Sequence, residues 1–177
     1  KHYMTVQLTV NEGNQYKLRN ITWEGNTIYP ASLLSQRLGF KPGEVYDVEK
    51  FEKNLRGNED QTDVASLYLD NGYLTFDLDR EEKRIANDSI DITIHVFERN
   101  QFKIGRVDVK GNTKTKEKVI RRELYTRPGD YFSRAAIFRS IRQLTQLNYF
   151  NSAKIRLDYK LLDDNTVDLR YEVEEQS

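Results

Sequence analysis

The most regular pattern in the chain is strict alternation between apolar and polar residues in two stretches. The apolar positions are Ile90, Ile92, Ile94 and Val96 in the first stretch, and Val167, Leu169, Tyr171 and Val173 in the second. Successive side chains of a strand point to opposite faces of a sheet. Each stretch therefore predicts a strand with one buried and one solvated face.

In the segments between the predicted strands, apolar residues recur at helical spacing. Residues three and four apart are apolar after two good N-cap candidates, Asp47 and Ser133. These apolar positions are Val48, Phe51 and Leu55 in one segment, and Ile137, Ile141 and Leu144 in the other. Shorter helices are predicted around Leu34 and Leu38, ended by Gly39, and around Ile120. Val64, Leu67 and Tyr68 extend the first pattern, and the spacing leaves open whether one long helix or two results.

The chain repeats itself. Residues 21–27, Ile-Thr-Trp-Glu-Gly-Asn-Thr, have their counterpart 86 positions later in residues 107–113, Val-Asp-Val-Lys-Gly-Asn-Thr. Pro42-Gly43 corresponds to Pro128-Gly129, and Asn71-Gly72-Tyr73 to Leu147-Asn148-Tyr149 at a smaller shift. The first copy therefore carries about ten extra residues, which we assign to the stretch 57–66.

Each copy predicts the order β-α-α-β-β. The opening strands break alternation between Leu18 and Ile21, and again between Ile104 and Val107, which predicts a bulge in both. Two amphipathic helices would cover one face of a three-stranded mixed sheet, so the predicted fold class is α+β, in tandem.

Composition excludes several functions. The 28 Lys+Arg residues balance 28 Asp+Glu residues, whereas a general nucleic-acid binder needs a basic excess. Cys is absent, which removes disulfide scaffolds, Cys-ligated zinc and thiol catalysis. No run approaches the roughly 18 apolar residues that span a membrane, and no secretory signal opens the chain.

No catalytic or metal-binding constellation is evident. His95 has no second His or Cys at ligand spacing, and Asp163-Asp164-Asn165 lacks the spacing of a calcium loop. Phosphate-binding loops and nucleophile elbows are also missing. We therefore predict no enzyme activity, no cofactor, no metal site and no small-molecule substrate.

These landmarks resemble a known family. Each unit of about 80 residues is similar to a POTRA (polypeptide-transport-associated) domain. The shared order is a strand ending in Gly-Asn, a helix, Pro-Gly, a second helix, Asn-Gly-Tyr and a closing hairpin. The segment 119–124, Val-Ile-Arg-Arg-Glu-Leu, is similar to the last POTRA domain of BamA-like outer-membrane assembly proteins. Asn148 stands where the family usually has Gly, and Asn also tolerates the left-handed conformation.

The resemblance implies a domain organisation and a setting. Residues 1–13 would be the last strand of a preceding POTRA domain, 14–99 a complete domain, and 100–177 the domain before a barrel. The implied location is the periplasmic face of the outer membrane. The implied partners are unfolded outer-membrane proteins, accessory lipoproteins and the protein's own C-terminal β-barrel, with no nucleic acid.

The resemblance also places the second strand of each sheet at an edge, with the last strand in the middle. Edge strands present unpaired N–H and C=O groups to which another extended chain can add. The predicted substrate-binding residues are Thr75, Phe76, Asp77, Leu78 and Asp79 in the first unit, and Ala153, Lys154, Ile155, Arg156 and Leu157 in the second.

A second hypothesis concerns a charged helix. Lys118, Arg121 and Arg122 could contact an acidic lipoprotein face or the barrel's periplasmic turns, although a solvated helix face is the simpler interpretation. Two other functions stay open. One is a POTRA region of another system, such as two-partner secretion or chloroplast import, and the other is a nucleic-acid-binding α+β module.

Overall fold

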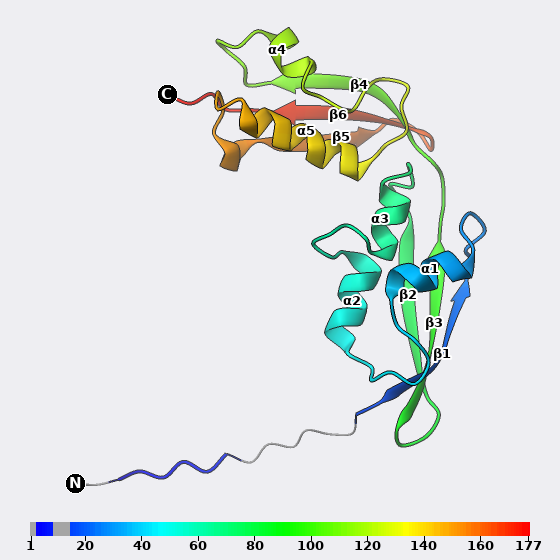
Figure 1. Cartoon of the computed structure of the whole chain (residues 1–177). Helices are drawn as coiled ribbons and strands as arrows, with labels where there is room; N and C mark the ends of the chain where they lie inside the picture. The colour runs from blue at the N-terminus through cyan, green and yellow to red at the C-terminus, as the bar shows by residue number, and fades with distance from the viewer. Residues whose placement is uncertain (1–2, 9–14) are drawn as a thin grey trace.

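Two sheets of three strands, each covered by helices, follow one another along the chain in the computed structural model, which describes residues 3–8 and 15–177 (Figure 1). The first unit contains β1 (Lys17–Glu24), α1 (Ala31–Leu38), α2 (Val48–Arg56), α3 (Val64–Leu69), β2 (Asp77–Arg84) and β3 (Ser89–Phe97). The second contains β4 (Lys103–Lys110), α4 (Glu117–Arg121), α5 (Arg134–Gln146), the 3₁₀ turn η1 (Ser152–Lys154), β5 (Arg156–Leu161) and β6 (Thr166–Glu172). The predicted α+β class is confirmed.

The last strand lies in the middle of both sheets. Strand order is β1-β3-β2 in the first and β4-β6-β5 in the second. The opening strand pairs in parallel with the central one, and the second strand pairs antiparallel to it. Register shifts between Leu18 and Asn20, and between Ile104 and Val107, confirm the predicted irregularities.

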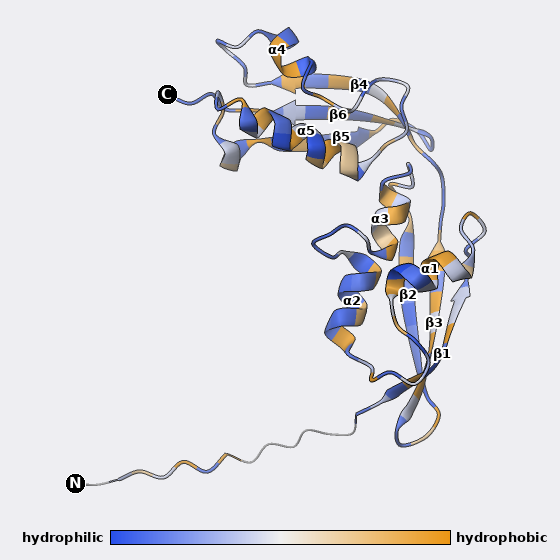
Figure 2. Ribbon diagram, in the orientation of Figure 1, coloured by the Kyte–Doolittle hydropathy of each residue, from blue (hydrophilic) through white to orange (hydrophobic). Residues whose placement is uncertain are grey.

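The alternating positions of the two central strands form the floor of two separate cores. Ile92, Ile94, Val167 and Tyr171 are all fully buried, and the apolar faces of the helices close over them. Figure 2 shows the mixture of polar and apolar residues along α2 and α5 that is typical of amphipathic helices.

The extra residues of the first unit divide its second helix into two. Asp63, fully buried, accepts hydrogen bonds from the Ser66 amide (3.0 Å) and hydroxyl (2.6 Å), and so begins α3. Arg37 donates to the carbonyls of Gln61 and Asp63, which fixes the insertion loop 57–63 against α1. The second unit has one uninterrupted helix, α5, in the same place.

Both predicted edge segments begin too early. Thr75 and Phe76 precede β2, because the Phe76 ring stacks on Tyr68 at 5.0 Å and holds the chain in a turn. Ala153 and Lys154 belong to η1, which starts where the Asn151 side chain accepts from the Ala153 amide, and Ile155 lies between η1 and β5. Asp77, Leu78, Asp79, Arg156 and Leu157 do lie in the edge strands.

The predicted strand at the start of the chain falls partly outside the described residues. Residues 3–8 have no regular secondary structure, and their side chains are exposed. A strand needs a neighbouring strand to pair with, so a preceding unit stays a prediction. Within residues 3–8 and 15–177, no helix is long and apolar enough to cross a membrane.

Each opening strand ends at a glycine that touches the central strand. Gly25 and Gly111 have φ of +86° and +93°, and a Cβ would lie 2.2 Å from the Val96 carbonyl oxygen and 1.8 Å from that of Val173. Only glycine fits there, because both the backbone conformation and the close approach exclude a side chain.

We expect Gly111→Ala to destabilise the second unit by more than the roughly 1–3 kcal/mol that a left-handed non-glycine residue costs, because the new methyl group also displaces the central strand. The matched control is Gly129→Ala, where φ is +90° but nothing lies within 4 Å of the added Cβ. Urea midpoints measured by circular dichroism check this. Equal losses of stability for the two variants would contradict the close-approach argument.

Candidate functional site

Within residues 3–8 and 15–177, the backbone groups on the outer edges of β2 and β5 have no neighbouring strand. At the β5–β6 turn the Leu162 amide donates to the Thr166 carbonyl. The backbone groups of the even-numbered residues of β5 therefore hydrogen-bond to β6. Hydrogen bonding alternates along an antiparallel strand, so Leu157, Tyr159 and Leu161 direct their N–H and C=O groups outward. By the same reasoning from Ile85 and Ser89, the outward residues of β2 are Leu78, Arg80, Glu82 and Arg84.

The opposite edges are partly covered by the chain itself. Beside β1, the Leu18 amide donates to Glu44, and the Tyr46 amide donates to Tyr16. Beside β4, the Ile104 amide donates to Asp130, and the Phe132 amide donates to Phe102. The second strand of each sheet is therefore the more open edge for strand addition.

The two open edges differ in chemistry. On β2, the outward Leu78 carbonyl already accepts from Arg56 of α2 (3.1 Å), and the Tyr46 hydroxyl donates to Glu82 (2.5 Å). Arg80 forms ion pairs with Glu52 and Glu82 and lies beside the Phe51 ring. Side chains of α2 and the loop before it thus bridge to the β2 edge.

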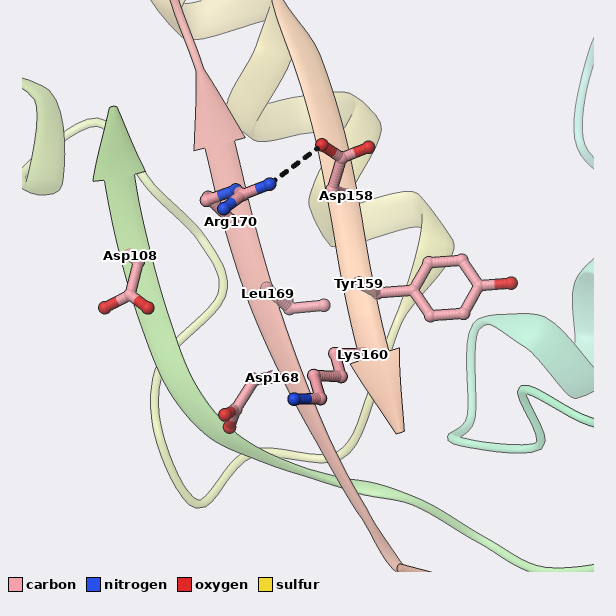
Figure 3. Close-up of a pocket in the computed structure, with 7 residues that line it drawn as sticks. All are labelled: Asp108, Asp158, Tyr159, Lys160, Asp168, Leu169 and Arg170. Atoms are coloured by element: carbon pink, nitrogen blue, oxygen red, sulfur yellow. Dashed lines mark ion pairs between the residues drawn. The ribbon is translucent and has the colours of Figure 1, made fainter. Parts of the chain in front are cut away.

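On β5 the outward residues are apolar and open. Tyr159 is 57% exposed and Leu161 is 44% exposed, and among the described residues no loop, turn or side chain hydrogen-bonds to their outward backbone groups. In Figure 3 the Tyr159 side chain extends outward from β5, away from β6. An added strand would find free backbone groups and an apolar surface at the same edge.

The opposite face of the second sheet is charged. A shallow hollow of about 200 Å³ lies there among Asp108, Asp158, Lys160, Asp168 and Arg170. Arg170 pairs with Asp158 at 3.5 Å, as Figure 3 shows, and the Asp168 carboxylate accepts from the Arg106 amide at 2.7 Å. Acidic and basic side chains therefore lie close together on this face.

The first sheet has a similar open face. The His95 imidazole lies between Glu24 (3.1 Å) and Glu81 (2.9 Å), and the hydrogen bond to Glu81 raises the pKa of His95. Within residues 3–8 and 15–177, no group of three His, Cys, Asp or Glu side chains is arranged to hold a metal ion.

The charged helix cluster is split by the structure. Arg121 pairs with Glu117 one turn earlier on α4, at 3.1 Å, whereas Lys118 and Arg122 are exposed and form no ion pair in the described part of the chain. Nothing in this geometry distinguishes the cluster from an ordinary solvated helix face.

Sequence reasoning missed the joint between the two units. The α3–β2 turn reaches the second unit, where the Asp70 carboxylate accepts from the Ala135 amide at the start of α5 (2.8 Å). Arg134 donates to the Ser66 hydroxyl, and the Phe102 amide donates to the Gly72 carbonyl at 2.8 Å. Gly72 has φ of +93°, and a Cβ there would lie 2.7 Å from the Gln101 side chain. These contacts fix one unit against the other.

A carboxylate after each central strand fastens the turn that follows the opening strand, and of the two Glu98 is buried whereas Glu175 is partly exposed. Glu98 accepts from the Thr27 hydroxyl (2.6 Å), the amides of Thr27 and Ile28, and the Tyr68 hydroxyl. Burial alone would raise the pKa of Glu98, but these donors together lower it. Glu175 repeats the arrangement with the Thr113 hydroxyl and then the Thr115 amide, which lower the pKa of Glu175 to about 2.

Comparison with known proteins assigns both units to one family. A model of the POTRA family, described as "Surface antigen variable number repeat", matches residues 16–99 and again residues 102–176. The chain belongs to the POTRA family.

Relatives of these POTRA domains include outer-membrane assembly proteins. The chain is 32% identical over its whole length to a Treponema pallidum (strain Nichols) protein named as an outer membrane protein assembly factor. It is also 32% identical, over 97% of its length, to BamA of Nitratidesulfovibrio vulgaris. The chain spans about a fifth of the length of these curated relatives, 20% and 22%.

The fold is also that of known POTRA structures. BamA from Haemophilus ducreyi lacking POTRA domains 1–3 superimposes with a TM-score of 0.70 at 18% identity, covering 92% of this chain and 29% of that one. POTRA1-2 of Omp85 from Anabaena superimposes with a TM-score of 0.54 at 10% identity, covering 93% and 98%. The predicted resemblance to POTRA domains is confirmed.

Acid should weaken the hydrogen bonds that the Glu175 carboxylate accepts. Because the pKa of Glu175 is lower in the folded POTRA domain than its ordinary 4.5, the stability it contributes is fully present above about pH 4.5 and is lost as the pH falls toward about 2. We expect Glu175→Gln to be less stable at neutral pH and to lose less stability over that acidic range. Urea unfolding at a series of pH values measures both effects.

The matched control for this prediction is Glu174→Gln, because Glu174 is an exposed neighbour that pairs with Lys154. If Glu175→Gln and the parent chain lost stability equally between about pH 4.5 and about 2, protonation of the Glu175 carboxylate would not cause the loss of stability.

Proposed function

We propose that this chain is the periplasmic POTRA region of a BamA-like outer-membrane protein assembly factor, and that it receives unfolded outer-membrane proteins by β-strand addition. The observation that carries the proposal is the outward row of backbone groups on β5, flanked by exposed Tyr159 and Leu161. The names of the relatives support the setting, and membership of the POTRA family supports a binding module in place of an enzyme.

Strand addition explains how one surface serves many substrates. Backbone hydrogen bonds do not depend on side-chain identity, so an extended segment of almost any sequence can pair with β5. Specificity then comes from alternate side chains. An incoming strand with apolar residues toward Tyr159 and Leu161, and polar residues toward Arg156 and Asp158, complements both faces of this edge. Strands of membrane barrels alternate in this way.

The edge of β2 is the weaker of the two proposed sites. An added strand there would compete with Arg56 for the Leu78 carbonyl and would disturb the network around Arg80. We therefore assign the main docking role to β5, with Arg156 and Leu157 at its start, and a secondary role to Asp77–Asp79.

The same proposal includes the other partners implied by the family. The chain would lie next to the protein's own barrel, and accessory lipoproteins would dock on the helix side, where Lys118, Arg121 and Arg122 are candidate contacts. The alternative of a nucleic-acid-binding module loses support, because the family match accounts for the α+β units without it.

Photo-crosslinking in cells, with the full-length protein, tests the function. A probe at Arg156 should capture outer-membrane protein precursors more strongly than a probe at Asp77, whereas a probe at Arg121 should capture a lipoprotein or the barrel. Tyr159→Pro removes an outward N–H group without breaking the β5–β6 ladder. Capture of precursors by the Arg156 probe should therefore fall several-fold.

Tyr159→Thr is the control for the lost ring, because threonine keeps both the N–H group and the preference for a strand. It should retain more capture than the proline variant. Undiminished precursor capture in a folded Tyr159→Pro protein would contradict strand addition at β5. Capture by the Arg121 probe alone would indicate that these domains act as a scaffold and that substrate binds elsewhere.

A further inference from the structure

The outward face of α5 carries positive charge that no acidic side chain in residues 3–8 and 15–177 pairs with. This helix contains Arg134, Arg139 and Arg142 and has no acidic residue, although the whole chain has equal numbers of acidic and basic residues. On α2 and α4, charged side chains pair one turn apart, as Arg56 does with Glu52. Within residues 3–8 and 15–177, Arg139 and Arg142 take part in no ion pair.

These arginines border a hollow of about 350 Å³ that both POTRA domains build. Ala135 and Ala136 give it a floor of small side chains, and Gln61 closes it from the insertion loop of the first domain. The Arg139 guanidinium lies over the Tyr125 ring, 4.1 Å from its centroid, which restricts the arginine before any partner binds. A cation held in place in this way loses less conformational freedom on binding.

The walls of the hollow are fixed relative to each other. Arg37 binds the Gln61 and Asp63 carbonyls and so holds the insertion loop in place. The joint through Asp70 and Ala135 fixes the start of α5 against the first domain. The hollow is therefore a preformed feature of the pair of domains and needs the insertion that only the first domain has.

We propose that this hollow, with Arg139 and Arg142, is a docking site for an acidic segment of a protein partner. The two arginines are three residues apart on one helix and so lie about 5–6 Å apart at Cβ. Two carboxylates one turn apart on a partner helix, or two residues apart on a partner strand, match this spacing. Arginine forms strong charge-assisted hydrogen bonds with carboxylates.

The position of the hollow favours a protein segment over a membrane surface. In Figure 1, α5 and α3 lie on the inner side of the bend between the two domains, next to the joint. A flat bilayer would meet the outer parts of such a bend first, whereas a narrow protein segment can enter it. The site is separate from the β5 edge, so this proposal does not depend on strand addition.

Nuclear magnetic resonance of the ¹⁵N-labelled chain tests the proposal, with a short peptide of alternating Glu and Ala as the probe. The peptide should shift the amide signals of Gln61, Ala136 and Arg142. The double variant Arg139→Gln/Arg142→Gln should weaken binding about tenfold or more, because both charged partners are lost. The control Lys83→Gln/Lys110→Gln, at two exposed lysines on β2 and β4, should change binding less than about twofold.

The spectra of both double variants also establish that they remain folded. Equal weakening by the two double variants would overturn the proposal, because the peptide would then read general positive charge. Absence of shifts at Gln61 and Ala136 would overturn it as well. So would binding of anionic phosphatidylglycerol vesicles, but not of the peptide, that depends on Arg139 and Arg142, since the surface would then recognise lipid.

Discussion

The position of the last strand of each POTRA domain between the other two constrains most of this structure. β3 and β6 each form a parallel ladder on one side and an antiparallel ladder on the other. Their alternating side chains form the floor of the cores, and their ends carry Glu98 and Glu175, which fasten the turn after each opening strand. With the centre occupied in this way, the second strand of each sheet lies at an edge, and its outer backbone groups have no strand partner in the described part of the chain.

The two domains use the same framework with different edges. In the first, α2 and Tyr46 reach over to the β2 edge through Arg56, Arg80 and Glu82. In the second, the corresponding outward positions of β5 are held by Tyr159 and Leu161 and remain exposed. A repeat thus gives two chemically distinct edges from one topology, so only one of them combines free backbone groups with an apolar surface.

Much of this fold could be predicted from the sequence, because alternation and helical spacing are local signals that the repeat presents twice. The landmarks around Gly25 and Gly111, the caps at Asp47 and Ser133, and the left-handed Asn148 are all found as expected. The starts of the edge strands were misplaced because they depend on packing, namely the stacking of Phe76 on Tyr68 and the cap at Asn151. The order of strands came from the family resemblance.

The candidate sites were harder to predict. Tyr159 belongs to a visible alternating pattern, but its exposure depends on where α5 lies above the sheet, which is a long-range property. The joint through Asp70 and the hollow beside Arg139 bring together residues more than 60 positions apart, so no local pattern marks them. Such contacts emerge only once both domains are placed in space.

Amide hydrogen exchange along β5 tests the central claim most directly, measured on this chain with and without a peptide copied from an amphipathic barrel strand. If the peptide adds as a strand, exchange should slow at the outward amides of Tyr159 and Leu161. It should change little at Asp158 and Lys160, which already pair with β6. Slowing at all four amides alike, or at none of them, would contradict strand addition at this edge.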